Sequence, residues 1–157
     1  MSPPPSTHPK EPLALVLAGE AGQGVQAVAG LLSGAFRQKG FSVFSGQEFM
    51  SRIRGGSNST LLRIASRPVR AWTDAMDLCI VFDEKAIAHL EKRLRPETLI
   101  LSDGLKATGK GYPMIDVPLG RLASESGGKI LVNTVAAGII WGIFDGDRQT
   151  LEGVIRR

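Results

Sequence analysis

The chain has few of the residues on which metal centres and disulfide frameworks are built. One cysteine, Cys79, and two histidines, His8 and His89, stand among its 157 residues. A single cysteine excludes an internal disulfide and any site held by cysteines alone. Cys79 lies in the apolar run 78–82, which predicts a buried thiol rather than a nucleophile. Neither histidine has a nearby cysteine or a metal-ligand spacing, so we find no self-sufficient catalytic centre.

Long apolar runs are missing as well. No stretch approaches the roughly 20 residues that a membrane span needs. The first eleven residues are rich in proline and serine and contain no apolar core of a secretory signal. We therefore expect a cytoplasmic protein without membrane contact. The 43% hydrophobic and 22% charged content is typical of one globular domain, and we assign residues 1–12 to a flexible leader and residues 13–157 to the domain.

Acidic residues and lysine are absent from residues 49–73, where the positive charge of the chain is concentrated. The segment carries five positive charges, while the remainder carries 14 basic and 15 acidic residues. Arginine without lysine favours bidentate recognition of phosphate or carboxylate, although a solvated strand edge protected by arginine is the alternative. We expect no nucleic acid partner, because only 6% of the residues are aromatic and no recognition motif is present. The arginines are Arg52, Arg54, Arg63, Arg67 and Arg70.

Strand-like and helix-like segments alternate along the chain. This alternation predicts an α/β domain with three α/β/α layers and a largely parallel, Rossmann-like sheet. Ligands of such sheets bind at the carboxyl ends of the strands. That edge should gather Gly19–Gly24, a loop over Gln47–Asn58, and Asp83, which is placed to cap the following helix. We predict strands at 13–18, 41–44, 59–65, 78–82, 98–102 and 115–117, and helices at 25–39, 85–94, 119–126, 134–144 and 150–157.

The most informative segment is the glycine turn, which we define as residues 19–24, Gly-Glu-Ala-Gly-Gln-Gly. A strand, a glycine-rich turn and a helix in this order present bare backbone N–H groups to an anion. The spacing differs from the dinucleotide fingerprint G-x-G-x-x-G, and the lysine of a P-loop is missing. Glu48 is the nearest acidic candidate for binding a ribose. The alternative is a tight turn that serves only helix–sheet packing.

Three segments occur together in an order that resembles the gamma domain of the 2-oxoacid:ferredoxin (acceptor) oxidoreductases. A fourth, Asn133-Thr134-Val135-Ala136-Ala137-Gly138, is similar to the helix start that follows in that family. The resemblance covers roughly residues 13–157 and looks most like the form found at the start of fused alpha subunits. The three segments are the glycine turn, Gln47-Glu48-Phe49-Met50-Ser51-Arg52-Ile53-Arg54-Gly55-Gly56, and Asp77-Leu78-Cys79-Ile80-Val81-Phe82-Asp83-Glu84-Lys85-Ala86.

The resemblance implies a function that the composition does not. Enzymes of this family oxidatively decarboxylate a 2-oxoacid, such as pyruvate or 2-oxoglutarate, and transfer the acyl group to coenzyme A. Thiamine diphosphate and iron–sulfur clusters are expected only on partner domains or subunits, with ferredoxin as an indirect partner. The gamma domain is an accessory α/β domain associated with coenzyme A binding and assembly. We therefore expect this chain to be part of an oxidoreductase and not catalytic on its own.

The resemblance also assigns candidate site residues by position. We expect these residues to face coenzyme A phosphates or an adjoining subunit. Ala21 departs from the family, which often has glycine there, and the family domain usually continues beyond the position of Arg157. A stand-alone Rossmann-type nucleotide-binding protein and a purely structural interaction module are the alternatives. The candidates are Gly19, Gly22, Gln23 and Gly24 in the glycine turn, and Arg52, Arg54, Gly55 and Gly56 in an arginine–glycine loop.

Overall fold

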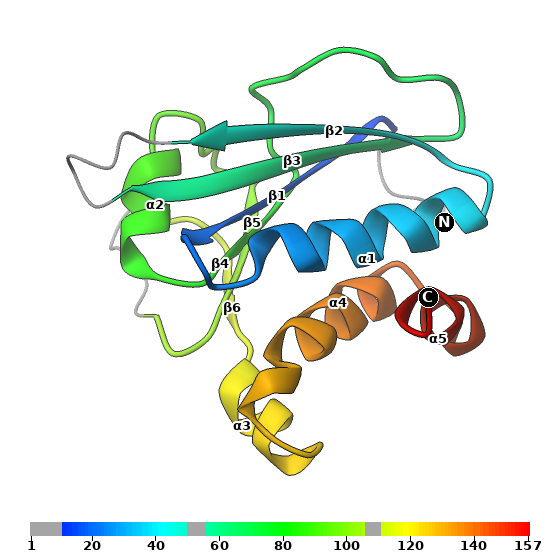
Figure 1. Ribbon diagram of the computed structural model, residues 1–157. Coiled ribbons are helices and arrows are strands. Elements are labelled where there is room, and N and C mark those ends of the chain that lie inside the picture. Colours follow the sequence, from blue (N-terminus) through cyan, green and yellow to red (C-terminus); the bar gives the residue numbers. More distant parts are fainter. Residues whose placement is uncertain (1–10, 50–55, 106–110) are drawn as a thin grey trace, which may run out of the picture.

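A six-stranded sheet forms the centre of the molecule in the computed structural model, which describes residues 11–49, 56–105 and 111–157 (Figure 1). The strand order is β2-β3-β1-β4-β5-β6. β1, β4, β5 and β6 pair in parallel, and β3 is antiparallel to both of its neighbours. The largely parallel sheet is therefore confirmed. The strands are β1 (Leu13–Glu20), β2 (Ser42–Phe49), β3 (Ser57–Ala65), β4 (Leu78–Val81), β5 (Leu99–Ser102) and β6 (Met114–Asp116).

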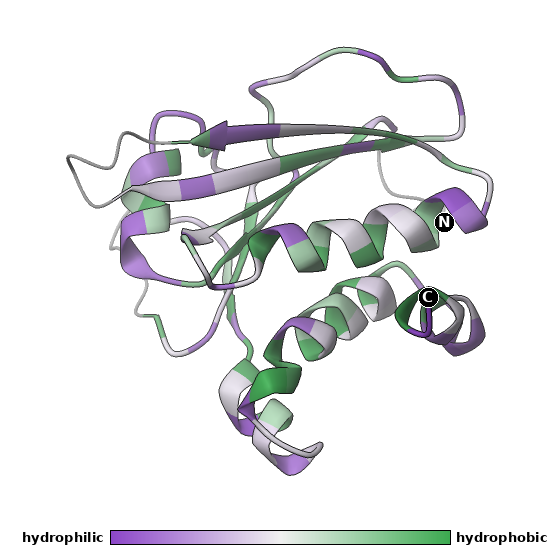
Figure 2. Cartoon of the chain, in the orientation of Figure 1, coloured by the Kyte–Doolittle hydropathy of each residue, from purple (hydrophilic) through white to green (hydrophobic). Residues whose placement is uncertain are grey.

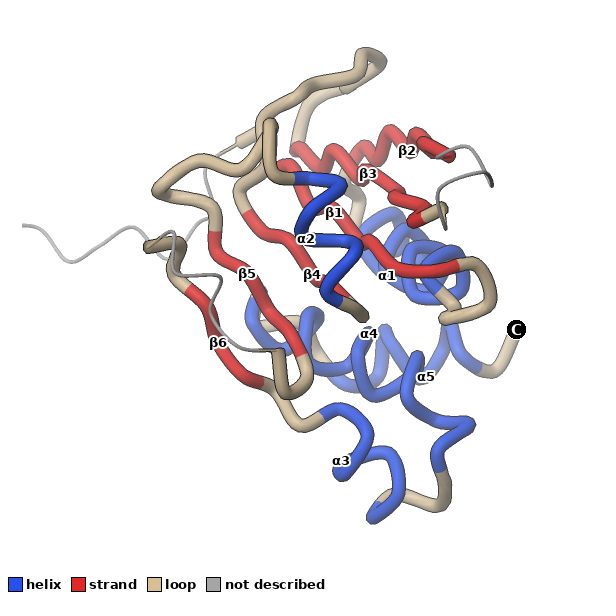
Figure 3. Tube along the Cα trace, turned by 90° about the vertical axis from the view of Figure 1, so that its left-hand side faces the viewer, coloured by secondary structure: helices blue, strands red, loops and turns tan. Residues whose placement is uncertain are grey.

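Helices cover both faces of the sheet, as three layers require. Figure 3 shows α2 in front of the strands, with α1, α4 and α5 behind them. None of the helices in the described parts of the chain is long and apolar enough to span a membrane. The helices are α1 (Val25–Gln38), α2 (Glu84–Leu90), α3 (Leu119–Glu125), α4 (Val132–Ile143) and α5 (Arg148–Ile155), with the short 3₁₀ helix η2 (Lys129–Leu131) before α4.

α1 forms because its apolar residues recur at helical spacing and bury one face. Val28 and Leu32 are fully buried, and Phe36 lies nearly so one turn later. The helix ends where Gly40 takes a φ of 88°, a left-handed conformation that glycine adopts without strain. The buried face of α1 shares one core with β1, α4 and the inner side of α5. This core fixes the start of α1 against the end of β1.

The second face of the sheet has a thinner cover. α2 has seven residues and contributes Ala86, Ile87 and Leu90 to a separate apolar cluster. Cys79 of β4 is fully buried in this cluster, and burial raises the pKa of its thiol to about 12. The predicted buried thiol is therefore confirmed. Figure 2 shows the inner strands mostly in hydrophobic colours and the far end of β2 in hydrophilic ones.

The expected loop over Gln47–Asn58 is partly wrong. β2 continues through Phe49, and β3 begins at Ser57, so both ends of the expected loop belong to an antiparallel pair of strands. The residues of β2 alternate between half-buried and exposed, because β2 is an edge strand that pairs only with β3. An edge strand with so little burial has few of the apolar residues that identify a strand in a sequence.

Candidate functional site

The glycine turn joins the end of β1 to the start of α1 in a conformation that two of its glycines make possible. Gly22 has a φ of 95° and Gly24 a φ of 80°, both in the left-handed region. The side chain of Gln23 closes the turn, since its Oε1 accepts from the backbone N–H of Glu20 at 2.8 Å. The backbone N–H of Gln23 donates back to the Glu20 carbonyl at 3.2 Å. The turn is therefore internally hydrogen-bonded.

The three glycines of the turn differ in the structural constraint that requires a residue without a Cβ. A Cβ on Gly24 would lie 1.9 Å from Nδ2 of Asn133, at the start of α4. A Cβ on Gly19 would lie 2.3 Å from Oε1 of Gln23 and 3.0 Å from the side chain of Phe82. Nothing stands within 4 Å of the corresponding point on Gly22. Packing therefore accounts for Gly19, packing and backbone conformation together account for Gly24, and backbone conformation alone accounts for Gly22.

Asp83 holds the glycine turn from the neighbouring strand. Its Oδ2 accepts from the backbone N–H of Glu20 at 2.9 Å, and its Oδ1 accepts from Ala86 at 2.8 Å, which caps α2. The expected cap and the expected meeting of Asp83 with the turn are both confirmed. Lys85 forms an ion pair with Glu20, and this hydrogen bond raises the pKa of Lys85. The carboxylate beside the turn is therefore balanced by a cation.

A cavity of about 350 Å³ opens between the glycine turn and the β2–β3 pair. The α1 N-terminus faces it, and within the described residues no side chain caps that end and its first turn carries no acidic residue. Uncapped N–H groups at a helix N-terminus attract anions. The lining residues are Glu20, Ala21, Gly22, Gly24, Val25, Gln26, Phe49, Asn58, Ser59 and Thr60.

Described residues on both sides of segment 50–55 line this cavity. Phe49 is the last residue of β2 and Asn58 lies opposite it in β3, and both line the cavity. Gly56, at the entry to β3, is half-buried. Arg52, Arg54 and Gly55 lie outside the described residues.

The other three arginines of the charged segment do not reach the glycine turn. The guanidinium of Arg63 donates to the carbonyl of Ala71 at 2.8 Å. Arg67 and Arg70 are exposed and follow the end of β3, and β3 runs away from the turn because it is antiparallel to β1. Three of the five arginines of the segment therefore lie away from the glycine turn.

Glu48, the acidic candidate for binding a ribose, does not line the cavity at the glycine turn. Its carboxylate points to the α2 side of the sheet, where Oε2 accepts from Nη1 of Arg93 at 3.0 Å and from Ser59 at 3.4 Å. Nε2 of His89 lies 3.9 Å from the same oxygen. The guanidinium of Arg93 also lies 5.4 Å from the ring centre of Trp72. This polar cluster fixes β2 to the segment around α2.

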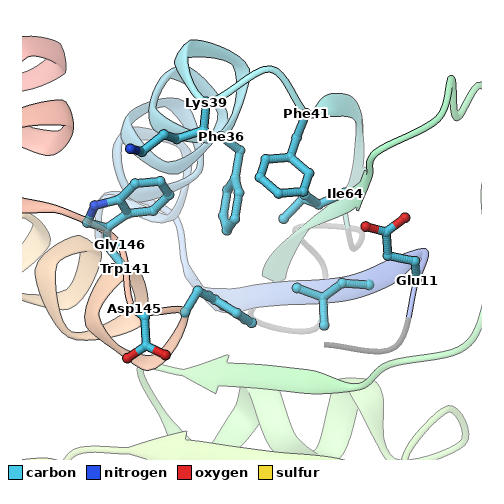
Figure 4. Close-up of a pocket in the computed structure, with 10 residues that line it drawn as sticks. Glu11, Phe36, Lys39, Phe41, Ile64, Trp141, Asp145 and Gly146 are labelled. Carbon is cyan, nitrogen blue, oxygen red and sulfur yellow. The ribbon is translucent and has the colours of Figure 1, made fainter. Parts of the chain in front are cut away.

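A second cavity, of about 330 Å³, lies near the start of β1 and the end of β3, away from the glycine turn (Figure 4). Its walls include Phe36, Phe41 and Trp141, whose rings meet edge to face around Phe36. Lys39 stands at the rim and forms an ion pair with Asp147, which caps α5. No candidate residue of the sequence analysis that the structure describes lines this cavity. Its apolar walls suit an apolar group better than a phosphate.

The described side chains offer no metal centre, because no group of three His, Cys, Asp or Glu residues there could hold an ion. Two residues of the site, Asn133 and Phe49, were named in the sequence analysis only as members of family-like segments, without a role in the site. Asn133 carried no sign that its amide packs on Gly24, and Phe49 was assigned to a loop. Its place at the end of a strand follows only once the pairing of β2 with β3 is known.

Comparison with known proteins identifies the family to which the chain belongs. The family model described as pyruvate ferredoxin/flavodoxin oxidoreductase matches residues 14–157. The chain belongs to this family. A 2-oxoacid:ferredoxin oxidoreductase subunit alpha from Sulfolobus sp. is 28% identical over 75 residues, and a counterpart from Sulfurisphaera tokodaii is 27% identical over 75 residues. Each match covers 48% of this chain and 12% of the relative, so the match spans a small part of those subunits.

Solved structures of family members share the fold. A 2-oxoglutarate:ferredoxin oxidoreductase from Magnetococcus marinus aligns with a TM-score of 0.79 at 23% identity, over 90% of this chain and 26% of that one. A keto/oxoacid ferredoxin oxidoreductase gamma subunit from Geobacter sulfurreducens aligns at 0.74 and 18% identity, over 91% and 84%. The pyruvate oxidoreductase subunit PORC from Thermotoga maritima aligns at 0.71 and 20%, over 92% and 83%. The resemblance to the 2-oxoacid:ferredoxin oxidoreductase family is therefore confirmed, and the likeness to these structures is one of fold.

Proposed function

We propose that this chain is the gamma-type accessory domain or subunit of a 2-oxoacid:acceptor oxidoreductase, and that residues 13–157 form that domain. In this proposal it contributes to coenzyme A binding and to assembly in the cytoplasm, and it carries out no decarboxylation itself. Thiamine diphosphate, iron–sulfur clusters and the contact with ferredoxin belong to partner domains or subunits. The 2-oxoacid, whether pyruvate, 2-oxoglutarate or another, is selected on those partners.

The cavity at the α1 N-terminus carries this proposal. Coenzyme A is a nucleotide with several phosphates, and uncapped helix amides beside an open cavity suit a phosphate. The ion pair between Lys85 and Glu20 supports the proposal, because it offsets the one carboxylate in the cavity lining. The Magnetococcus marinus structure was solved with coenzyme A and succinyl-CoA bound, which also supports a coenzyme A role for this fold.

The arginine–glycine loop extends the proposed site. Residues 50–55 connect Phe49 to Gly56 in the sequence. β2 ends and β3 begins at the rim of the cavity. We place Arg52 and Arg54 toward the phosphates or an adjoining subunit, because planar guanidinium groups bind phosphate and carboxylate bidentately.

The first test is calorimetry of the 157-residue chain with coenzyme A at low and high salt. Binding that saturates and weakens with salt is the expected result, because exposed charges are screened. NAD serves as the comparison ligand, since preferential binding of NAD would favour a stand-alone nucleotide-binding protein. The chain supplied with thiamine diphosphate and a 2-oxoacid should show no decarboxylation, and measurable turnover would contradict the accessory role.

The second test uses paired arginine variants in the assembled enzyme. Arg52→Ala with Arg54→Ala should raise the KM for coenzyme A or weaken assembly, with each lost phosphate contact costing about 1.5–3 kcal/mol. Arg67→Ala with Arg70→Ala removes the same charge from beyond the end of β3, away from the glycine turn, and is the control. Equal effects of the two pairs would show that net charge alone acts, and no effect of the first pair would refute the loop assignment.

A structural interaction module is a second candidate, favoured by the close packing of Gly19 and Gly24. That packing explains two glycines without any ligand. Co-purification of the chain with partner subunits, combined with no coenzyme A binding by the chain or by the assembled enzyme, would favour this candidate.

A further inference from the structure

Phe49 is an aromatic residue in an unusual position. It ends β2 with 62% of its surface exposed, and it lines the cavity at the glycine turn. Exposure of a phenyl ring to water is unfavourable, and covering the ring lowers the free energy. Because Phe49 pairs with Asn58 in the strand register, its backbone is held beside the cavity without a ligand.

The groups around Phe49 are those that a flat heteroaromatic ring requires. Asn58 lies directly opposite Phe49 in the strand register and also lines the cavity. Its amide offers both a donor and an acceptor, as the edge of a nucleobase does. Ala21 and Val25 add apolar surface on the α1 side of the cavity. An aromatic ring for stacking and an amide for edge recognition thus face the same cavity as the α1 amides.

We propose that Phe49 is the residue on which the adenine ring of a nucleotide ligand stacks. The inference rests on the proposed function, since it assigns the base-binding end of the same cavity. The phosphates would then lie toward the α1 N-terminus and the base toward the β2–β3 pair. Stacking is sequence-tolerant, because every base has a π-face, and Asn58 supplies the hydrogen bonds that an edge requires.

The test divides coenzyme A into its two halves. Adenosine 3′,5′-bisphosphate carries the base and phosphates, and pantetheine carries the remainder. Phe49→Leu keeps apolar bulk but removes the ring, and it should weaken binding of coenzyme A and of the bisphosphate about tenfold. Phe49→Tyr keeps the ring and should bind both within about twofold of the unchanged chain. Pantetheine binding should be the same in all three proteins.

Ile130→Ala is the matched control. Ile130 is 89% exposed and lies in η2, outside the cavity lining, so its truncation removes exposed apolar surface elsewhere. It should leave binding of the bisphosphate unchanged. Circular dichroism of each variant confirms that the fold is retained, which is expected because truncating an exposed side chain leaves no buried cavity.

The outcomes separate this inference from the proposed function. If the unchanged chain and the assembled enzyme both fail to bind coenzyme A and the bisphosphate, the proposed function is wrong and the inference is lost with it. If they bind but Phe49→Leu binds equally well, the stacking role is wrong and the proposed function stands. Loss of pantetheine and bisphosphate binding by the same factor would also overturn the stacking role.

Discussion

Replacing Gly24 by alanine tests the packing of the glycine turn directly. The substitution places a Cβ 1.9 Å from Nδ2 of Asn133 and keeps the residue at a φ of 80°. The left-handed conformation costs an L-residue about 1–2 kcal/mol. Forcing the Asn133 amide out of its place adds a penalty of the kind seen on overpacking, about 1–3 kcal/mol. We therefore expect Gly24→Ala to lower the free energy of unfolding by about 2–5 kcal/mol.

Gly22 is the matched control because it shares the conformation but not the contact. Its φ is 95°, and a Cβ there would meet nothing within 4 Å. Gly22→Ala should therefore cost only the conformational part, about 1–2 kcal/mol. Urea denaturation followed by circular dichroism measures both variants, with unchanged m-values confirming that the denatured state is comparable.

A double-mutant cycle with Asn133→Ala identifies the source of the difference. Oδ1 of Asn133 is buried without a hydrogen-bond partner among the described residues, so removing the amide should itself be mild. Adding Asn133→Ala should raise the free energy of unfolding of Gly24→Ala by about 1–3 kcal/mol. The same addition should leave the free energy of unfolding of Gly22→Ala unchanged. If Gly24→Ala cost no more than Gly22→Ala, or showed no coupling to Asn133, the packing argument would be refuted.

Three other contacts have measurable consequences. The hydrogen bond from Lys39 lowers the pKa of Asp147 from 3.8 to about 2, so the pair stabilises the fold above pH 3.8 and this stabilisation is lost as the pH falls toward 2. Asp147→Asn should therefore flatten the pH dependence of the unfolding midpoint between these two values. Cys79 should resist a thiol reagent at about pH 8 until denaturant is added, and rapid native labelling would contradict its burial. Glu48→Gln should lower the free energy of unfolding by about 1–3 kcal/mol, because Arg93 loses the nearer of its two carboxylate partners, and an unchanged urea midpoint would show that the pair is dispensable.

The part of the fold that the sequence predicted is the part that buries apolar residues in a regular pattern. Val28, Leu32 and Phe36 marked the inner face of α1, and the apolar run around Cys79 marked a central strand. The order of the strands was not predicted, because the insertion of β3 antiparallel between β1 and β2 leaves no mark on the composition of either strand. The end of β2 was not predicted, because the strand lies at the edge of the sheet and its polar residues do not form an apolar pattern.

The candidate site was predicted to a similar extent. The glycines of the turn could be identified because left-handed backbone and close packing demand that residue type. The arginines could be counted but not placed, since only the direction of β3 shows that Arg67 and Arg70 lie far from Gly24. Asn133 is distant in sequence and meets the turn only through the packing of α4 against α1. Long-range contacts of this kind carry no local pattern.

The two hydrogen bonds of Asp83 link the stability of the glycine turn to that of α2. One carboxylate oxygen holds Glu20 and the other holds the first turn of α2, on the opposite face of the sheet. Fraying of α2 that withdraws Asp83 therefore takes a bond from the turn, and a ligand that orders the turn lowers the chance of that fraying. By thermodynamic linkage the two effects are equal in free energy. A helix that does not itself line the cavity thus influences the turn that does.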